Sequence, residues 1–155
     1  MSQTTEIPPS LRSSAAPAGY NTLQPYIIVS NAAEAMRFYA RAFGATERMC
    51  MKSPEGKVIH AELQFGDSVL MLADEHPEIG ACAPPHFGGS PVNLMIYVEN
   101  CDAAYRQALE AGAVSVREPA DQNYGDRMSG VLDPFGYKWW IAHPLPKGDL
   151  VETAP

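Results

Sequence analysis

An internal repeat constrains the fold of this chain more than any other feature of its sequence. Residues 24–74 and 93–143 each begin with a short apolar run that is followed by an Asn, Asn31 in the first segment and Asn100 in the second. An Asn in this position caps a helix, and an Ala-rich stretch with helical spacing of its apolar residues follows both times. Each stretch ends at a Gly-Ala pair, as expected where a glycine takes the left-handed conformation after a helix.

Three further strands are predicted after each helix. They are expected at about 46–52, 58–65 and 67–73 in the first segment, and at about 114–118, 127–132 and 137–142 in the second. Val98 follows Val29 by 69 positions, and Gly112 follows Gly44 by 68. The sequence thus predicts an α+β fold of two tandem βαβββ modules, which form a partly open sheet around a central cavity with the helices outside. Such a cavity is a natural place for a small ligand.

The segments outside the repeat are rich in proline or in small polar residues. Four prolines and three glycines fall within residues 75–91, which is typical of a linker or a long loop. We predict one domain over 23–143, made of module one (24–74), a Pro/Gly linker (75–91) and module two (92–143), with flexible tails over 1–22 and 144–155.

Charge and composition exclude several classes of partner. The net charge is −7 and Lys and Arg form no cluster, which argues against nucleic acid. The longest apolar run, Val69–Ala73, is far too short to cross a membrane, and the first 22 residues show no signal peptide. Cys50, Cys82 and Cys101 form no C-x-x-C pair and are typical of reduced thiols. We expect a cytoplasmic protein that meets small molecules or other proteins.

The order and spacing of several short motifs resemble those of the vicinal oxygen chelate superfamily, which includes glyoxalase I, bleomycin-resistance proteins and extradiol dioxygenases. The motifs are Val29-Ser30-Asn31, Phe43-Gly44, Val98-Glu99-Asn100 and Asp133-Pro134-Phe135-Gly136. Within the superfamily the chain looks most similar to the PhnB-like group, through His60-Ala61-Glu62-Leu63 and Tyr124-Gly125-Asp126-Arg127. The resemblance implies the glyoxalase-like fold and a homodimer, and for the enzymes of the superfamily it implies a divalent metal held by four side chains.

The resemblance places those four metal-binding positions at Gln24, Leu70, Asn93 and Trp140. Leucine and tryptophan offer no ligand to a divalent cation, and two neutral amides make a poor site. We therefore expect the usual metal centre to be missing and no cofactor to be present, while a divalent metal stays possible if the register differs by one or two residues. The two amides would then satisfy strand ends or line a wet pocket. Trp140 would either join Trp139 in core and interface packing or make an aromatic floor for planar or cationic ligands.

Polar side chains alternate along the strand predicted at 58–65. His60, Glu62 and Gln64 share one face of it, which is either a solvent face or part of the cavity wall. On a cavity wall, His60 and Glu62 would act as a general acid/base pair or as two metal ligands.

A second candidate segment precedes the strand at 127–132. Tyr124 and Arg127 would offer a hydroxyl and a guanidinium to an anionic or carbonyl ligand. The alternative is an ordinary turn that Asp126 ties to local backbone amides.

Three hypotheses for function follow. The first is a glyoxalase/bleomycin-resistance-like protein that binds a small organic molecule in the cavity between the modules, with a cationic planar molecule favoured by the charge of −7. The second is a glyoxalase-type lyase or isomerase that uses His60 and Glu62 with or without a metal. The third is a non-catalytic dimeric scaffold whose cavity is filled by its own side chains.

Overall fold

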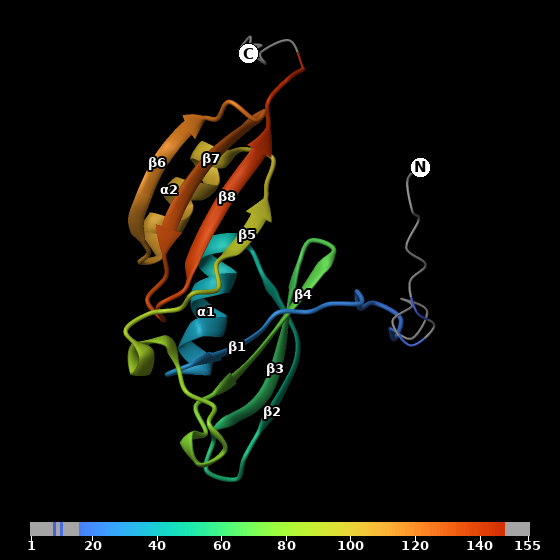
Figure 1. Ribbon diagram of the computed structural model, residues 1–155. Helices are drawn as coiled ribbons and strands as arrows, with labels where there is room; N and C mark the ends of the chain where they lie inside the picture. The colour runs from blue at the N-terminus through green and yellow to red at the C-terminus, as the bar shows by residue number, and fades with distance from the viewer. Residues whose placement is uncertain (1–7, 9, 11–15, 148–155) are drawn as a thin grey trace.

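The computed structural model describes residues 8, 10 and 16–147, which fold into two modules of one helix and one four-stranded sheet each (Figure 1). Module one contains β1 (Tyr26–Val29), α1 (Ala32–Phe43), β2 (Thr46–Lys52), β3 (Val58–Phe65) and β4 (Ser68–Asp74). Module two contains β5 (Leu94–Tyr97), α2 (Cys101–Ala111), β6 (Val114–Asp121), β7 (Asp126–Leu132) and β8 (Lys138–Pro144). The α+β class and the tandem βαβββ repeat are confirmed.

Both sheets have the same topology. Their strand orders are β1-β4-β3-β2 and β5-β8-β7-β6, with the first strand of each module parallel to the last and the other neighbours antiparallel. Strands β6 and β8 run a few residues further than predicted, so the tail expected from residue 144 begins inside β8. Residues 1–7, 9, 11–15 and 148–155 of the predicted tails lie outside the described residues.

The predicted helix caps are present. The Asn31 side chain accepts a hydrogen bond from the backbone N–H of Glu34 at 3.1 Å, and Asn100 does the same for Ala103 at 3.0 Å. Helix α1 ends at Gly44, whose φ of 70° lies in the left-handed region. These local signals fix where each helix begins and ends, and so they fix which residues reach the sheet beneath it.

The modules meet through their helices and an aromatic cluster. Helices α1 and α2 pack against each other, while each sheet keeps its own strands. Trp139 of β8 stacks against Phe65 with ring centroids 5.5 Å apart and lies 4.7 Å from the ring of Phe43. The Tyr39 hydroxyl donates to the buried Asp133 carboxylate at 2.6 Å. This apolar junction with one carboxylate at its centre holds the two sheets in a fixed orientation.

The proline-rich connection between the modules packs against module two. It contains two short 3₁₀ helices, Pro77–Ile79 and Pro84–Phe87. Pro84 is buried, and a Cβ added at Gly136 would lie 2.7 Å from its ring. Within the described residues, no helix is long and apolar enough to cross a membrane.

Candidate functional site

Each sheet has one face covered by its helix and one open face, and the open face of the first sheet carries the sharpest polar cluster. Strand register places Tyr26, Met71, Glu62 and Met49 in one row across all four strands. Because strand side chains alternate between faces, His60 lies on the same side as Glu62. This face is covered only in part: Glu62 is 5% exposed, whereas Met49 and Met51 on the same face are 40% and 52% exposed.

Four side chains on this face form a continuous hydrogen-bonded chain. The Tyr20 hydroxyl donates to Glu62 Oε2 at 2.6 Å, and Glu62 Oε1 lies 3.1 Å from His60 Nε2. The other ring nitrogen of His60, Nδ1, lies 2.9 Å from the Tyr26 hydroxyl oxygen. The sequence placed His60 and Glu62 two residues apart on one strand face, and the structure brings their side chains into direct contact.

The Glu62 carboxylate is stabilised in its charged form. The hydrogen bond from Tyr20 is the main cause that lowers the pKa of Glu62, with smaller contributions from His60 and Arg48 that together outweigh burial. The same contact raises the pKa of the Tyr20 hydroxyl. The site therefore presents an ionised carboxylate and a protonated phenol at neutral pH.

A β-bulge brings a cation to this cluster. The pairing of β2 with β3 shifts between Glu47 and Met49, so that Arg48 is the extra residue on β2. Its guanidinium lies 4.0 Å from Glu62 Oε2 and 4.6 Å from the centre of the Tyr20 ring. Sequence reasoning missed Arg48 and Tyr20, because neither a bulge nor a contact between distant segments has a clear local signal.

The open face of the second sheet is aromatic where the first is polar. Register places Met95, Trp140, Gly130 and Arg117 in one row, which matches the row of the first sheet. The Trp140 ring lies flat over Gly130, since a Cβ there would come within 2.4 Å of it. Trp139 points to the opposite face and is 2% exposed. The two tryptophans thus divide between the core and the open face, as strand alternation predicts.

The structure corrects the register of the expected metal-binding positions by one residue. Met71, not Leu70, is the counterpart of Trp140, because the two occupy equivalent places in the matching rows. Leu70 is 3% exposed and packs beneath the helix. With Met71 in place of Leu70, the four positions offer two amides, a thioether and an indole, which do not fit a divalent cation. No three His, Cys, Asp or Glu side chains among the described residues converge on a point that could hold a metal ion.

Gln24, Asn93 and Tyr124 lie at the margins of the open faces. Gln24 precedes β1, and its Oε1 is buried without a hydrogen-bond partner among the described residues. Asn93 is exposed directly before β5. Tyr124 is 59% exposed in the turn before β7, where its hydroxyl lies 3.4 Å from Met128 Sδ. Of these three, Gln24 alone presents an unused buried acceptor, which a ligand N–H or O–H would satisfy.

Arg127 does not take the place that the sequence suggested. It lies on the helix side of β7, where Nε and Nη2 donate to Asp102 at 2.6 and 2.9 Å and Nη1 donates to Asp121 at 2.9 Å. The hydrogen bonds to these carboxylates raise the pKa of Arg127 above its ordinary value, and the hydrogen bond from Arg127 lowers the pKa of Asp102. The guanidinium therefore links α2 to β6 and β7 instead of facing a ligand.

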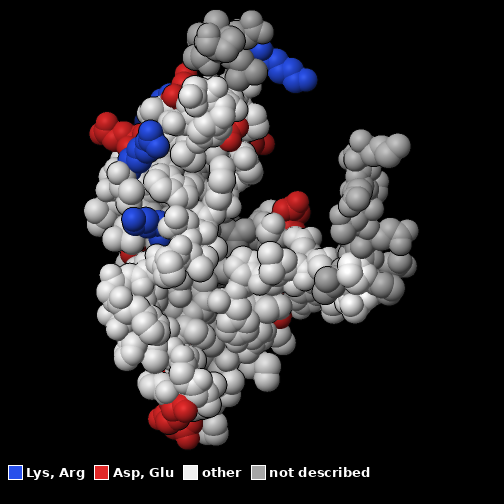
Figure 2. Space-filling view, viewed as in Figure 1, with Lys and Arg blue, Asp and Glu red and all other residues white. Residues whose placement is uncertain are grey.

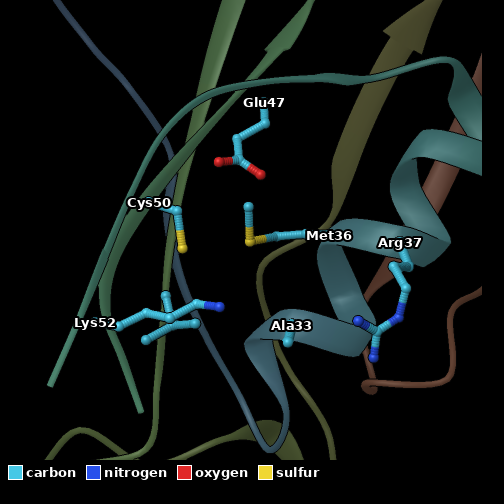
Figure 3. A pocket seen from close by; sticks show the side chains of 7 residues that line it. Ala33, Met36, Arg37, Glu47, Cys50 and Lys52 are labelled. Atoms are coloured by element: carbon cyan, nitrogen blue, oxygen red, sulfur yellow. The ribbon is translucent and has the colours of Figure 1, made fainter. Parts of the chain in front are cut away.

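The structure has a groove between the two modules and a hollow between α1 and β2. A groove of about 480 Å³ runs between the modules, with Phe43, Phe65 and Trp139 in its lining and β5 along one side. Uncharged side chains make up most of the surface shown in Figure 2. A separate hollow of about 440 Å³ lies between α1 and β2, where Met36 and Cys50 face each other among charged side chains (Figure 3). It lies on the helix side of the first sheet, away from the His60–Glu62 cluster.

Two βαβββ modules with open sheet faces define a glyoxalase-like protein. The chain belongs to the Glyoxalase/Bleomycin resistance protein/Dioxygenase superfamily, whose sequence profile matches residues 20–141. The Mycobacterium tuberculosis protein Rv0887c is 38% identical over 133 residues, covering 84% of this chain and 78% of that protein. The X-ray structure of the Arabidopsis thaliana gene product At5g48480 superposes with a TM-score of 0.62 at 27% identity, over 77% of this chain and 96% of that chain. The Bacillus cereus PhnB protein shares the fold, with a TM-score of 0.59 at 18% identity over 78% and 98% of the two chains.

Proposed function

We propose that this protein binds a small aromatic molecule against its open sheet faces, without the metal centre of the glyoxalase enzymes. The observation that carries the proposal is Glu62, an ionised carboxylate that is almost fully buried on a face lined by methionines. Methionine side chains adapt to ligands of different shape, and the carboxylate gives one fixed polar contact. A surface of this kind suits an apolar ring that carries one hydrogen-bond donor.

The second module supplies an aromatic surface for such a ligand. Trp140 and Tyr97 are both on the open face of the second sheet, where Met95 is paired directly with Trp140 and Tyr97 lies two residues further along β5. A Trp ring gives large contact area to a planar molecule and attracts cationic ones. The net charge of −7 also favours cationic ligands.

We also propose that a second copy of the chain completes the cavity. The open faces belong to separate sheets, and within the part of the chain that the structure describes both β1 and β5 are edge strands with no strand partner on one side. Exposed apolar side chains lie along these edges, namely Leu23, Val92, Met95 and Tyr97. Unpaired edges with apolar residues are typical of surfaces that pair with another chain. Sedimentation of the wild type and of Tyr97→Glu tests this, with a dimer expected only for the wild type; a monomeric wild type would contradict it.

Tryptophan fluorescence tests the binding function. Ethidium and a neutral planar probe, 2-naphthol, are titrated into the wild type, and each is expected to quench the emission and to raise the melting temperature. Trp140→Phe should abolish most of the quenching, whereas quenching that persists in this variant would place the probe in the groove that Trp139 lines and not on the open face. If neither probe quenches the wild type nor raises its melting temperature, the protein does not bind aromatic molecules at this face.

An enzyme of the lyase or isomerase type is the second candidate. The contact between His60 Nε2 and Glu62 Oε1 favours it, because a carboxylate orients an imidazole for general acid/base work. This candidate predicts turnover of the hemithioacetal formed from methylglyoxal and glutathione, followed by ultraviolet absorbance. The turnover should be lost in Glu62→Ala, and turnover that persists in that variant would rule out this role for Glu62.

A further inference from the structure

Residues 17–20 form a turn that places one side chain on the open face of the first sheet. The N–H of Tyr20 donates to the carbonyl of Pro17 at 3.1 Å, and Gly19 between them has a φ of 85°. A Cβ at Gly19 would lie 3.3 Å from the Arg48 guanidinium, whose Nη1 donates to the Gly19 carbonyl at 2.9 Å. The turn therefore needs glycine for its conformation, and a side chain there would also crowd the Arg48 guanidinium.

Besides the Gly19 carbonyl, the Tyr20 phenol anchors this turn to the sheet. Its hydroxyl donates to Glu62, its ring lies on the Arg48 guanidinium, and the residues on either side of it are exposed. Glu62 meets the hydroxyl end of this side chain and belongs to the row that crosses the sheet. The segment contributes little to the apolar core, so its ordering depends on the Tyr20 side chain and on the hydrogen bond from Arg48 to the Gly19 carbonyl.

The contacts of Tyr20 indicate which chemical group of a ligand could replace the Tyr20 phenol beside Glu62 and Arg48. The carboxylate of Glu62 accepts a hydrogen bond, and the planar guanidinium of Arg48 stacks on the face of an aromatic ring. Arg48 already lies close to Glu62, so a second cation at this point meets repulsion from the guanidinium. A neutral hydroxyl on an aromatic ring satisfies both groups, as Tyr20 itself does.

We propose that Tyr20 is an internal occupant of a subsite for phenolic ligands, formed by Glu62, His60 and Arg48, and that a phenolic ligand enters by displacing residues 17–20. The inference rests on the proposed function, because it names the group that an aromatic ligand presents to Glu62. An occupant attached to the same chain competes at an effective concentration of about millimolar. The wild type is therefore a weaker binder of simple phenols than a chain without the Tyr20 ring.

The test uses p-cresol, the free counterpart of the tyrosine side chain, with calorimetric titration. Tyr20→Ala is expected to bind p-cresol about tenfold more tightly than the wild type, or better, with toluene binding much more weakly because it lacks the hydroxyl. Tyr20→Phe, which keeps the ring, should show a smaller gain. Adding Glu62→Gln to Tyr20→Ala should remove most of the affinity, whereas Glu118→Gln, an equal change of charge on exposed β6, should not.

A second measurement follows the displacement in the wild type. Saturating p-cresol should speed hydrogen exchange at the Tyr20 amide, because its hydrogen bond to Pro17 opens when the turn leaves the sheet. The proposal is overturned if Tyr20→Ala fails to bind p-cresol, if toluene binds equally well, or if p-cresol binds the wild type without changing this exchange. If one of these results is obtained while ethidium or 2-naphthol still quenches Trp140, the phenolic subsite is refuted and the proposed function is retained.

Discussion

Replacing Tyr39 by phenylalanine tests whether Asp133 fixes the orientation of the two modules. The Asp133 carboxylate is buried and accepts four hydrogen bonds, two from side chains and two from backbone N–H groups. Of these donors, Tyr39 alone belongs to module one. Tyr39→Phe removes the 2.6 Å contact and leaves the aromatic ring in place. The three remaining donors, all from module two, still satisfy the carboxylate.

The expected loss in the free energy of unfolding follows from the charge of the Asp133 carboxylate, which accepts the hydrogen bond. A hydrogen bond to a charged group contributes about 1.5–3 kcal/mol, so Tyr39→Phe should lower the free energy of unfolding by about 2 kcal/mol. With a urea slope of about 2 kcal/mol per molar, the midpoint should fall by about 1 M at unchanged slope. Tyr137→Phe is the matched control. Its hydroxyl donates to the neutral Ile28 carbonyl at 2.8 Å, which corresponds to about 1 kcal/mol.

The pH dependence provides a second check on this reasoning. Burial raises the pKa of Asp133, so the folded state favours the protonated carboxyl more than the unfolded state does. Stability from this group is complete below the unfolded pKa and is lost as the pH rises through the folded one. The Tyr39 hydrogen bond lowers the folded pKa, so its removal should cost more at about pH 7 than at about pH 4. Equal losses for Tyr39→Phe and Tyr137→Phe, or a loss independent of pH, would refute the assignment.

Three further predictions concern single side chains. The lowered pKa of Glu62 gives stability that is present above its ordinary value of 4.5 and is lost as the pH falls through the folded value, so Glu62→Gln should flatten the acid limb of a stability–pH curve. A steeper limb would contradict this. Gly130→Ala should displace the Trp140 ring, shift its fluorescence and destabilise the protein by about 1–3 kcal/mol in urea unfolding; an unchanged spectrum would show that the ring does not lie there. Asn31→Ala should lower the free energy of unfolding by about 1 kcal/mol through loss of the α1 cap, and no loss would mean that water replaces it.

The sequence predicted the architecture because its local signals recur. Asn31 and Asn100 cap helices, Gly44 ends one, and their spacing identifies the repeat. Each of these signals acts within a few residues of itself. The class, the order of elements and most boundaries could therefore be derived without any knowledge of long-range contacts.

The site was harder to predict because it depends on register and on distant contacts. A strand has a side-chain period of two, so an error of one residue moved the expected position from Met71 to Leu70 and from the open face to the core. Tyr20 and Glu62 are 42 residues apart, and no periodicity connects them. Arg127 had carboxylate partners in α2 and β6 that were invisible along the chain.

Because Arg48 is the extra residue of a β-bulge, the presence of a guanidinium beside Glu62 depends on the number of residues in β2. Deleting residue 48 would remove the first of the two register shifts between β2 and β3, so the strand would survive while its cation disappeared. Among relatives, the number of residues between the glycine that ends α1 and the His-Ala-Glu stretch of β3 therefore becomes a marker that can be counted in unaligned sequences. A relative one residue shorter there is expected to keep the fold and to hold a phenol, if at all, without a guanidinium beneath its ring.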